Sequence, residues 1–149
     1  MAATGADVRI RPVDELDISA IVSIDEKVSG KYRPEDWERR IAYYLRRDPE
    51  ASVVAEVRGR VVGFMLGEVR AGEFGLEEPT GWIEVLGVDP AERKAGIGRL
   101  LAEAITAHFR GKGAKSVRTL VDTRMAEIAK YFESIGLAPS SIRVYEKTL

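Results

Sequence analysis

The stretch that most constrains the fold is GVDPAERKAGIGRLL, residues 87–101. It begins as the end of an apolar strand, breaks at Asp89 and Pro90, and continues as a helix with apolar residues at helical spacing. Between strand and helix, Gly96 and Gly98 lie among three cationic side chains. Glycine lets the backbone approach a ligand closely, and a helix N-terminus carries partial positive charge. The pattern therefore indicates a strand, loop and helix that bind an anion.

Two known phosphate loops fit this stretch poorly. A Walker loop needs a lysine and a serine or threonine after its last glycine, but Arg99 and Leu100 follow Gly98. A dinucleotide loop needs a glycine or alanine three residues after Gly98 and an early place in the chain, but Leu101 stands there and the loop lies past the middle. A nucleotide-binding enzyme is therefore disfavoured and is kept as a third hypothesis.

Composition excludes several other classes of protein. The chain has 149 residues, which suits a single domain over residues 1–149, and a net charge of -1 gives no basic excess for a nucleic-acid partner. It has no cysteine and one histidine, so no thiolate nucleophile and no metal site are expected. The start, MAATGADVRIRPV, has no charged segment followed by a long apolar run. We therefore expect a cytoplasmic protein with no signal peptide and no membrane partner.

Apolar periodicity predicts ten elements in the order β-α-α-β-β-β-α-β-α-β. Strands joined by a hairpin, followed by helical crossovers, favour an α/β (α+β) fold with a mixed, mostly antiparallel central sheet flanked by helices. The expected elements are a strand at 7–13, helices at 14–28 and 34–48, a hairpin of two strands at 51–69, a strand at 81–88, a helix at 96–113, a strand at 114–121, a helix at 123–136 and a last strand at 141–149.

The residues VDPAERKAGIGRLL are similar to the signature of the GNAT superfamily of N-acetyltransferases. That signature is arginine or glutamine, two residues, glycine, one residue, then glycine or alanine, entered through V-x-P at a strand end. It is matched by Val88, Pro90, Arg93, Gly96 and Gly98. The element order is also the family's, and YFESIGL resembles the end of the family's next helix. The resemblance implies direct acetyl transfer from acetyl-CoA to the primary amine of a small molecule, polyamine or peptide. A homodimer is one option for the assembly of the chain.

The resemblance also implies which residues contact coenzyme A, the carrier of the acetyl co-substrate. In the family the loop amides bind the pyrophosphate, and the strand before the loop binds the pantetheine arm and the thioester carbonyl. An aromatic residue on the following helix lies beside the arm. Carried over to this chain, the contacts are Leu86, Gly87, Val88, Arg93, Lys94, Ala95, Gly96, Ile97, Gly98, Arg99 and Phe132.

Glu84 is the candidate general base or water-positioning residue. It stands among apolar residues in GWIEVLGV, and a buried carboxylate without a partner is tuned towards taking up a proton near neutral pH. An amine acceptor is mostly protonated at that pH and must lose a proton before it attacks a thioester. Polyamine acetyltransferases of the resembled family have a glutamate at this position. The alternative is a strand glutamate that faces solvent or pairs with an arginine.

The expected general acid is missing. Where many family members have a tyrosine, this chain has Phe132, and Tyr131 precedes it. A displacement of one residue turns a helical side chain by about 100°, so Tyr131 is only a weak substitute, and Tyr145 is another weak candidate. Met125 also replaces a frequent asparagine. These departures keep open a second hypothesis, a non-catalytic acyl-CoA-binding or regulatory module.

Acceptor residues are expected on the first two helices and the loop between them, as the resemblance implies. Tyr32 and Trp37 are candidates there, as is Phe74 in the GEFGL loop, although the spacing of Trp37 also fits ordinary core packing. Two arginine pairs, at 39–40 and 46–47, are interpreted as a solvated helix face that could also attract an acidic acceptor.

Overall fold

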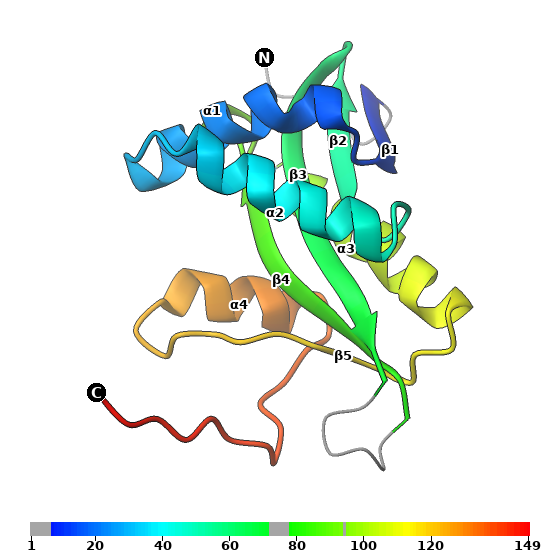
Figure 1. Ribbon diagram of the computed structural model, residues 1–149, viewed down its shortest axis with the longest axis vertical. Helices are drawn as coiled ribbons and strands as arrows, with labels where there is room; N and C mark the ends of the chain where they lie inside the picture. The colour runs from blue at the N-terminus through cyan, green and yellow to red at the C-terminus, as the bar shows by residue number, and fades with distance from the viewer. Residues whose placement is uncertain (1–6, 72–77, 94) are drawn as a thin grey trace. The chain divides into compact units, whose positions relative to one another are not determined.

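The computed structural model describes residues 7–71, 78–93 and 95–149, in two compact units, Met1–Thr119 and Leu120–Leu149. The first unit holds a five-stranded sheet in the order β1-β2-β3-β4-β5 (Figure 1). The first four strands are antiparallel and β5 is parallel to β4, which confirms the predicted mixed, mostly antiparallel sheet. The strands are β1 (Val8–Pro12), β2 (Val53–Val57), β3 (Arg60–Arg70), β4 (Thr80–Val88) and β5 (Ser116–Arg118).

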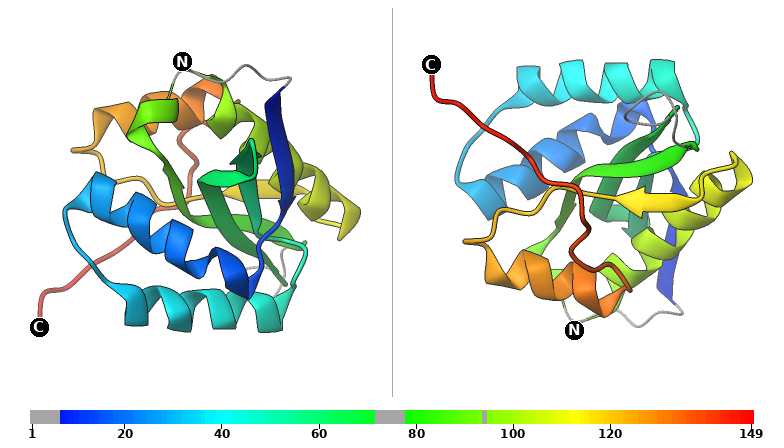
Figure 2. Two further views of the ribbon diagram at one scale, coloured as in Figure 1. Left: turned by 90° about the horizontal axis from the view of Figure 1, so that it is seen from above. Right: turned by 90° about the horizontal axis from the view of Figure 1, so that it is seen from below.

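Three helices cover the two faces of this sheet. Helices α1 (Ile18–Ser29) and α2 (Pro34–Arg47) lie on one face and α3 (Ile97–Gly111) lies on the other (Figure 2). Under α2 the rings of Trp37 and Phe64 meet edge to face, with centroids 5.3 Å apart, within a buried apolar cluster. Short 3-10 turns, η2 (Glu15–Asp17) and η3 (Pro90–Glu92), precede α1 and follow β4. The core therefore fixes α2 against the strands that lead into the glycine loop.

The predicted hairpin is confirmed, but its turn lies one residue before Gly59 and Arg60, where the two β-branched runs of the sequence meet. Arg58 and Gly59 both have positive φ, 51° and 75°, which is the backbone of a type I′ turn. Such a turn matches the twist of the flanking strands, so β2 and β3 pair directly across it.

The second unit contains one helix, α4 (Ala126–Ser134), in the part that the structure describes. The strand expected at 141–149 does not form: these residues are exposed and carry neither helix nor strand. The alternating pattern of SIRVYEKTL fits a strand, but a strand also needs a neighbouring edge for its backbone hydrogen bonds, and no described strand pairs with it. The strand expected at 114–121 is likewise limited to Ser116–Arg118. That residues 1–149 form a single domain stays a prediction.

Candidate active site

Glu84 occupies a β-bulge in β4. Leu66 of β3 lies opposite Val85, and the next residue, Gly67, lies opposite Ile83, so Glu84 has no partner residue on β3. A bulge inserts one extra residue into a strand and re-aims its side chain, and bulges are common beside active sites. Here the bulge directs the Glu84 carboxylate away from the apolar side chains that lie next to it in β4. In the sequence, the only sign of this bulge was a charged residue among the apolar residues of GWIEVLGV. The alternation of side chains along the strand did not by itself identify the bulge.

The Glu84 carboxylate has two partners. It accepts a hydrogen bond from the Tyr44 hydroxyl of α2 at 2.5 Å and forms an ion pair with Arg70 of β3, and its side chain is 24% exposed. The interpretation as a buried carboxylate without a partner is therefore wrong, and pairing with an arginine, the alternative, is what the structure shows. A paired carboxylate at a bulge is held in one position, and its role as a base stays a prediction.

A second carboxylate, Glu68 of β3, lies in the same network. It is buried and accepts a hydrogen bond from the Tyr43 hydroxyl at 3.0 Å, with Arg47 Nε at 3.4 Å and Arg70 Nε at 3.3 Å. Arg70 thus joins Glu68 to Glu84. Sequence reasoning missed this network. Its signal was present in the spacing of Glu68 and Arg70, two residues apart on one strand and so on one face of the sheet.

The partners of Glu84 are themselves held in place. The Arg70 guanidinium lies 4.9 Å from the centre of the Trp82 ring, a cation–π contact. Burial raises the pKa of the Tyr44 hydroxyl, and the hydrogen bond to Glu84 raises it further, so this hydroxyl stays protonated at neutral pH. Tyr44 is therefore a fixed hydrogen-bond donor to Glu84.

Beyond the bulge, one edge of β4 is open. β5 pairs with β4 only from Thr80 to Trp82, and the Thr119 hydroxyl then donates to the Ile83 carbonyl at 2.8 Å. From there to the end of β4, no strand in the described part of the chain pairs with this edge. Backbone groups of an open edge can bind an extended ligand as an added strand would. Leu86, Gly87 and Val88, the predicted pantetheine contacts, lie on this stretch.

The turn after β4 is fixed by Asp89. Its side chain is buried, accepts a hydrogen bond from the Ala91 amide at 3.0 Å and pairs with Lys27 of α1 at 3.0 Å. Burial raises the pKa of this carboxyl group, but the hydrogen bonds from Ala91 and Lys27 outweigh that effect and hold the pKa below its ordinary value. The Asp89 amide also donates to the Val62 carbonyl at 2.8 Å, so the turn is tied to the core.

Gly96 begins α3 in a left-handed conformation. Its φ is 78°, which favours glycine, and no side chain caps the helix at this position. A Cβ atom there would meet nothing within 4 Å, so the space next to the Gly96 backbone is open. Ile97 is buried and anchors the turn, while Arg93 and Arg99 are exposed around it. Ala95 and Gly98 are partly buried, and Lys94 lies outside the described residues.

The remaining candidates are dispersed. Tyr32 is 70% exposed and lines a groove of about 500 Å³ with residues of α1, whereas Trp37 is buried and donates from Nε1 to Asp25 at 2.8 Å. Phe74 lies outside the described residues. In the second unit, which is described by itself, Phe132 is buried, Tyr131 is partly buried and Tyr145 is 94% exposed.

The described ranges contain neither a metal-binding cluster nor a membrane-spanning helix. No group of three or more histidine, aspartate or glutamate side chains within residues 7–71, 78–93 and 95–149 is arranged to hold a metal ion. Across the same ranges, no helix combines the length and the apolar character needed to cross a membrane.

Comparison with known proteins gives a consistent result. The sequence profile of the acetyltransferase (GNAT) family matches residues 18–137. A mycothiol acetyltransferase of Thermobispora bispora is 34% identical over 129 residues, which is 87% of this chain but 43% of that protein. This chain thus spans less than half the length of the first curated relatives it matches.

Solved structures show the same fold. An aminoglycoside N-acetyltransferase, AAC(6′)-Iy in complex with CoA, superposes with a TM-score of 0.81 at 17% identity and covers 95% of this chain and 94% of its own. Ard1 from Thermoplasma volcanium has a TM-score of 0.75 at 25% identity, covering 91% of this chain and 85% of its own.

Proposed function

This chain belongs to the acetyltransferase (GNAT) family, and on that premise we propose that it transfers the acetyl group of acetyl-CoA to a primary amine. The observation that carries the proposal is the bulge at Glu84. It places a fixed carboxylate at the start of an open strand edge, and that edge leads directly into the turn before Gly96. A base, an edge for an extended ligand and an anion-binding helix start thus follow one another along a single stretch of chain.

The residues after β4 fit the pyrophosphate of coenzyme A. Gly96 leaves open space at the start of α3, and the partial positive charge of the first helical turn is worth roughly 0.3 to 1 kcal/mol for a bound anion. The exposed cations Arg93 and Arg99 add full charges nearby. The open edge of β4 fits the pantetheine arm, which runs from the pyrophosphate towards the thioester.

Direct transfer is the reaction that these residues favour. Bound acetyl-CoA supplies an activated acyl group; the acceptor nitrogen forms the new N–C bond as the C–S bond breaks and the thiolate leaves. Glu84 takes the proton from the amine, either directly or through a water molecule. Tyr44 and Arg70 keep the carboxylate in position for this step. The sequence has no cysteine to carry a thioester intermediate, in agreement with direct attack.

We further propose a small-molecule amine as the acceptor. The names of the matched proteins support this class, since they refer to mycothiol and to aminoglycosides. A polyamine or a peptide amine would be bound by the same chemistry at Glu84, so these remain arms of the experiment. Residues 1–149 are proposed to act as one catalytic domain.

Activity and binding measurements test the proposal together. Acetyl-CoA should raise the melting temperature, and release of CoA should be seen with one or more members of a panel of amines, polyamines, amino acids and peptides. Glu84→Gln should lower kcat by roughly 10²-fold, the usual contribution of a general base. Glu56→Gln is the matched control, because Glu56 is also a strand glutamate paired with an arginine, Arg11, at 2.7 Å.

Three outcomes separate the hypotheses. Stabilisation by acetyl-CoA without turnover of any acceptor would favour the non-catalytic acyl-CoA-binding module. Stabilisation by ATP or NAD at least as strong as that by CoA would favour the nucleotide-binding enzyme. Equal turnover by Glu84→Gln and wild type would remove Glu84 from the mechanism.

A further inference from the structure

One flank of α2 extends beyond the carboxylate network. Successive helical residues turn by about 100°, so Arg40, Tyr44 and Arg47 lie within a narrow sector beside the core-facing side of the helix, and Arg33 directly precedes the first turn. Tyr44 of this flank bonds Glu84, and Arg47 bonds the neighbouring carboxylate Glu68. The flank therefore faces the proposed base at its C-terminal half. Its N-terminal half carries the two remaining arginines.

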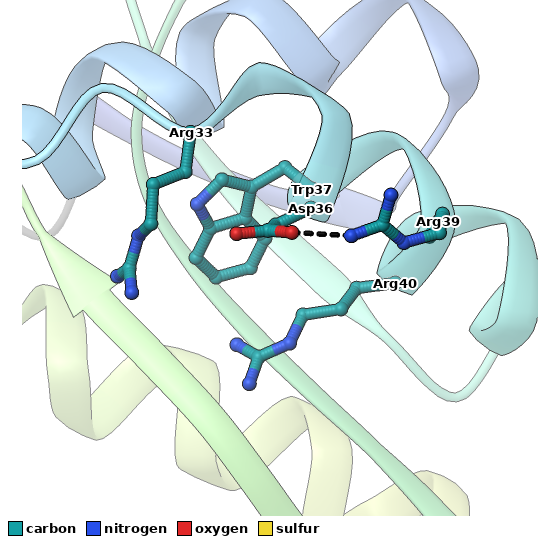
Figure 3. Close-up of a pocket in the computed structure, with 5 residues that line it drawn as sticks. All are labelled: Arg33, Asp36, Trp37, Arg39 and Arg40. Carbon is teal, nitrogen blue, oxygen red and sulfur yellow. Dashed lines mark hydrogen bonds and ion pairs between the residues drawn. The ribbon is translucent and has the colours of Figure 1, made fainter.

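That N-terminal half forms a small pocket. Its volume is about 260 Å³, below the roughly 300 to 1,000 Å³ typical of pockets that enclose a drug-sized molecule. It therefore has room for one chemical group of a ligand rather than for the whole ligand. Figure 3 shows the Arg33 and Arg40 side chains reaching to the same side of the helix, with the Trp37 ring between them. The lining residues are Arg33, Asp36, Trp37, Arg39 and Arg40.

Two of the three arginines in the pocket already have a carboxylate. Arg39 pairs with Asp36, one turn before it on α2. Arg33 donates from Nη2 to Asp25 Oδ1 at 2.8 Å and from Nε to Asp25 Oδ2 at 3.1 Å. When Asp25, the partner of Arg33 outside the lining, is counted with the lining residues, one positive charge is left over, and it belongs to Arg40.

Arg40 is held without a counter-ion. Its guanidinium lies 5.2 Å from the centre of the Trp37 ring, and no carboxylate of the described residues pairs with it. Trp37 is itself 2% exposed and hydrogen-bonded to Asp25, so the ring that supports Arg40 is fixed. A guanidinium presents a planar fork of donors that matches a carboxylate or phosphate. Arg40 is exposed, so this fork is accessible to a ligand, and the contact with the Trp37 ring favours one orientation of the guanidinium.

We propose that this pocket binds a carboxylate or phosphate group carried by the acceptor, and that this contact directs the acceptor's amine towards Glu84. The inference rests on the proposed function and names the substrate class. Four residues separate Arg40 from Tyr44, or roughly 6 Å along the helix axis, and Tyr44 contacts Glu84. The acceptor is therefore a primary amine with an anionic group roughly 6 Å or more from the nitrogen, too far for an α-amino acid.

Matched acceptors test this class. 6-Aminohexanoate and its neutral amide have the same length and the same amine, and glucosamine 6-phosphate and glucosamine form a second pair for phosphate. We expect kcat/KM to be at least about 10-fold higher for the anionic member of one or both pairs, the ratio that one charge-assisted hydrogen bond of about 1.5 kcal/mol provides. Glycine, whose charges are close together, should gain nothing from its carboxylate over glycinamide.

Variants of Arg40 assign the preference to the pocket. In Arg40→Gln the anionic-to-neutral ratio should fall to near 1, and in Arg40→Lys, which keeps the charge but loses the fork, it should be intermediate. Arg46→Gln is the matched control, since Arg46 is an exposed arginine of α2 outside the pocket lining, and the ratio should be unchanged. A melting temperature for each variant confirms that it is folded.

A binding measurement separates this inference from the proposed function. Calorimetry with 6-aminohexanoate and its amide, in the presence of CoA, reports the preference without turnover. If no acceptor turns over but the preference for the anion is present and lost in Arg40→Gln, the proposed function fails and the anion pocket stands. If acceptors turn over with a ratio near 1 in wild type, or with a ratio that Arg40→Gln does not change, the pocket is overturned and the function stands.

Discussion

Asp25 ties α1 to α2, and its removal should destabilise the protein by about 1 to 4 kcal/mol. The residue is 8% exposed and accepts hydrogen bonds from Arg33 and from Trp37 Nε1. In Asp25→Ala the buried indole N–H loses its partner, which costs about 1 to 3 kcal/mol. Arg33 has a side chain 39% exposed, so its charge regains water and the lost ion pair adds only about 0.2 to 1 kcal/mol.

Two further variants isolate the orphaned donor. Asp25→Asn keeps an oxygen for Trp37 and loses the charge, so it should cost only about 0.2 to 1 kcal/mol. In a Trp37→Phe background no indole N–H is present, and the cost of Asp25→Ala should shrink accordingly. The difference between the alanine and asparagine variants, about 1 to 3 kcal/mol, is therefore the decisive quantity.

Urea denaturation followed by tryptophan fluorescence measures these free energies of unfolding. Each kcal/mol corresponds to a shift of about 2 to 4 °C in melting temperature for a chain of this size. Hydrogen bonds from Arg33, acting against burial, hold the pKa of Asp25 below its ordinary value of 3.8. The charged Asp25 side chain thus stabilises the folded state above pH 3.8, and this stabilisation is lost as the pH falls through the lowered pKa. The free energy of unfolding should therefore fall with pH in the wild type, and Asp25→Asn should lack this part of the pH dependence. Equal stability of the alanine and asparagine variants at neutral pH would refute the reasoning.

Two further predictions concern the sheet and the turn after β4. Gly81→Ala should lower the free energy of unfolding by about 1 to 3 kcal/mol, because the new Cβ would lie 2.2 Å from Cδ2 of the buried Phe109 ring. Gly111→Ala is the control: its Cβ would meet nothing within 4 Å, so this variant should be neutral or stabilised by up to about 1 kcal/mol. A urea titration measures both. Asp89→Asn should make the free energy of unfolding fall less steeply at acid pH, since the pKa of Asp89 is lower in the folded protein than its ordinary value of 3.8 and its charge therefore stabilises the fold above that pH. If the variant loses stability with falling pH as steeply as the wild type does, the Lys27 contact does not have this role.

Local patterns were sufficient to predict most of the first unit. The hairpin, the apolar strand and the glycine start of the following helix depend on residues close together in sequence, and the structure has all three. Gly96 is the clearest case, because its left-handed φ is a property that glycine alone tolerates well. The mixed sheet followed from the order of these elements.

Features that depend on distant partners could not be predicted in the same way. The bulge at Glu84 exists only relative to the register of β3, and its partners Tyr44 and Arg70 come from a helix and a strand far away in sequence. The strand expected at 141–149 is the opposite case: its local sequence pattern suits a strand, but no described strand pairs with it. The cation excess at Arg40 likewise depends on which neighbouring arginines already have carboxylates.

Because of the bulge, deleting Glu84 should disturb β4 much more than substituting Glu84 does. Because side chains alternate along a strand, the extra residue reverses the parity of the alternation: Thr80 and Trp82 share a face with Val85 and Gly87. A substitution at Glu84 removes the carboxylate but leaves this alternation of side chains unchanged. Deleting Glu84 would restore a regular ladder and force one half of the strand to exchange the side chains that face α1 and α2 with those that face α3. Length at this position is therefore constrained independently of charge, and a shortened strand should fail to fold correctly even if a carboxylate were supplied next to it.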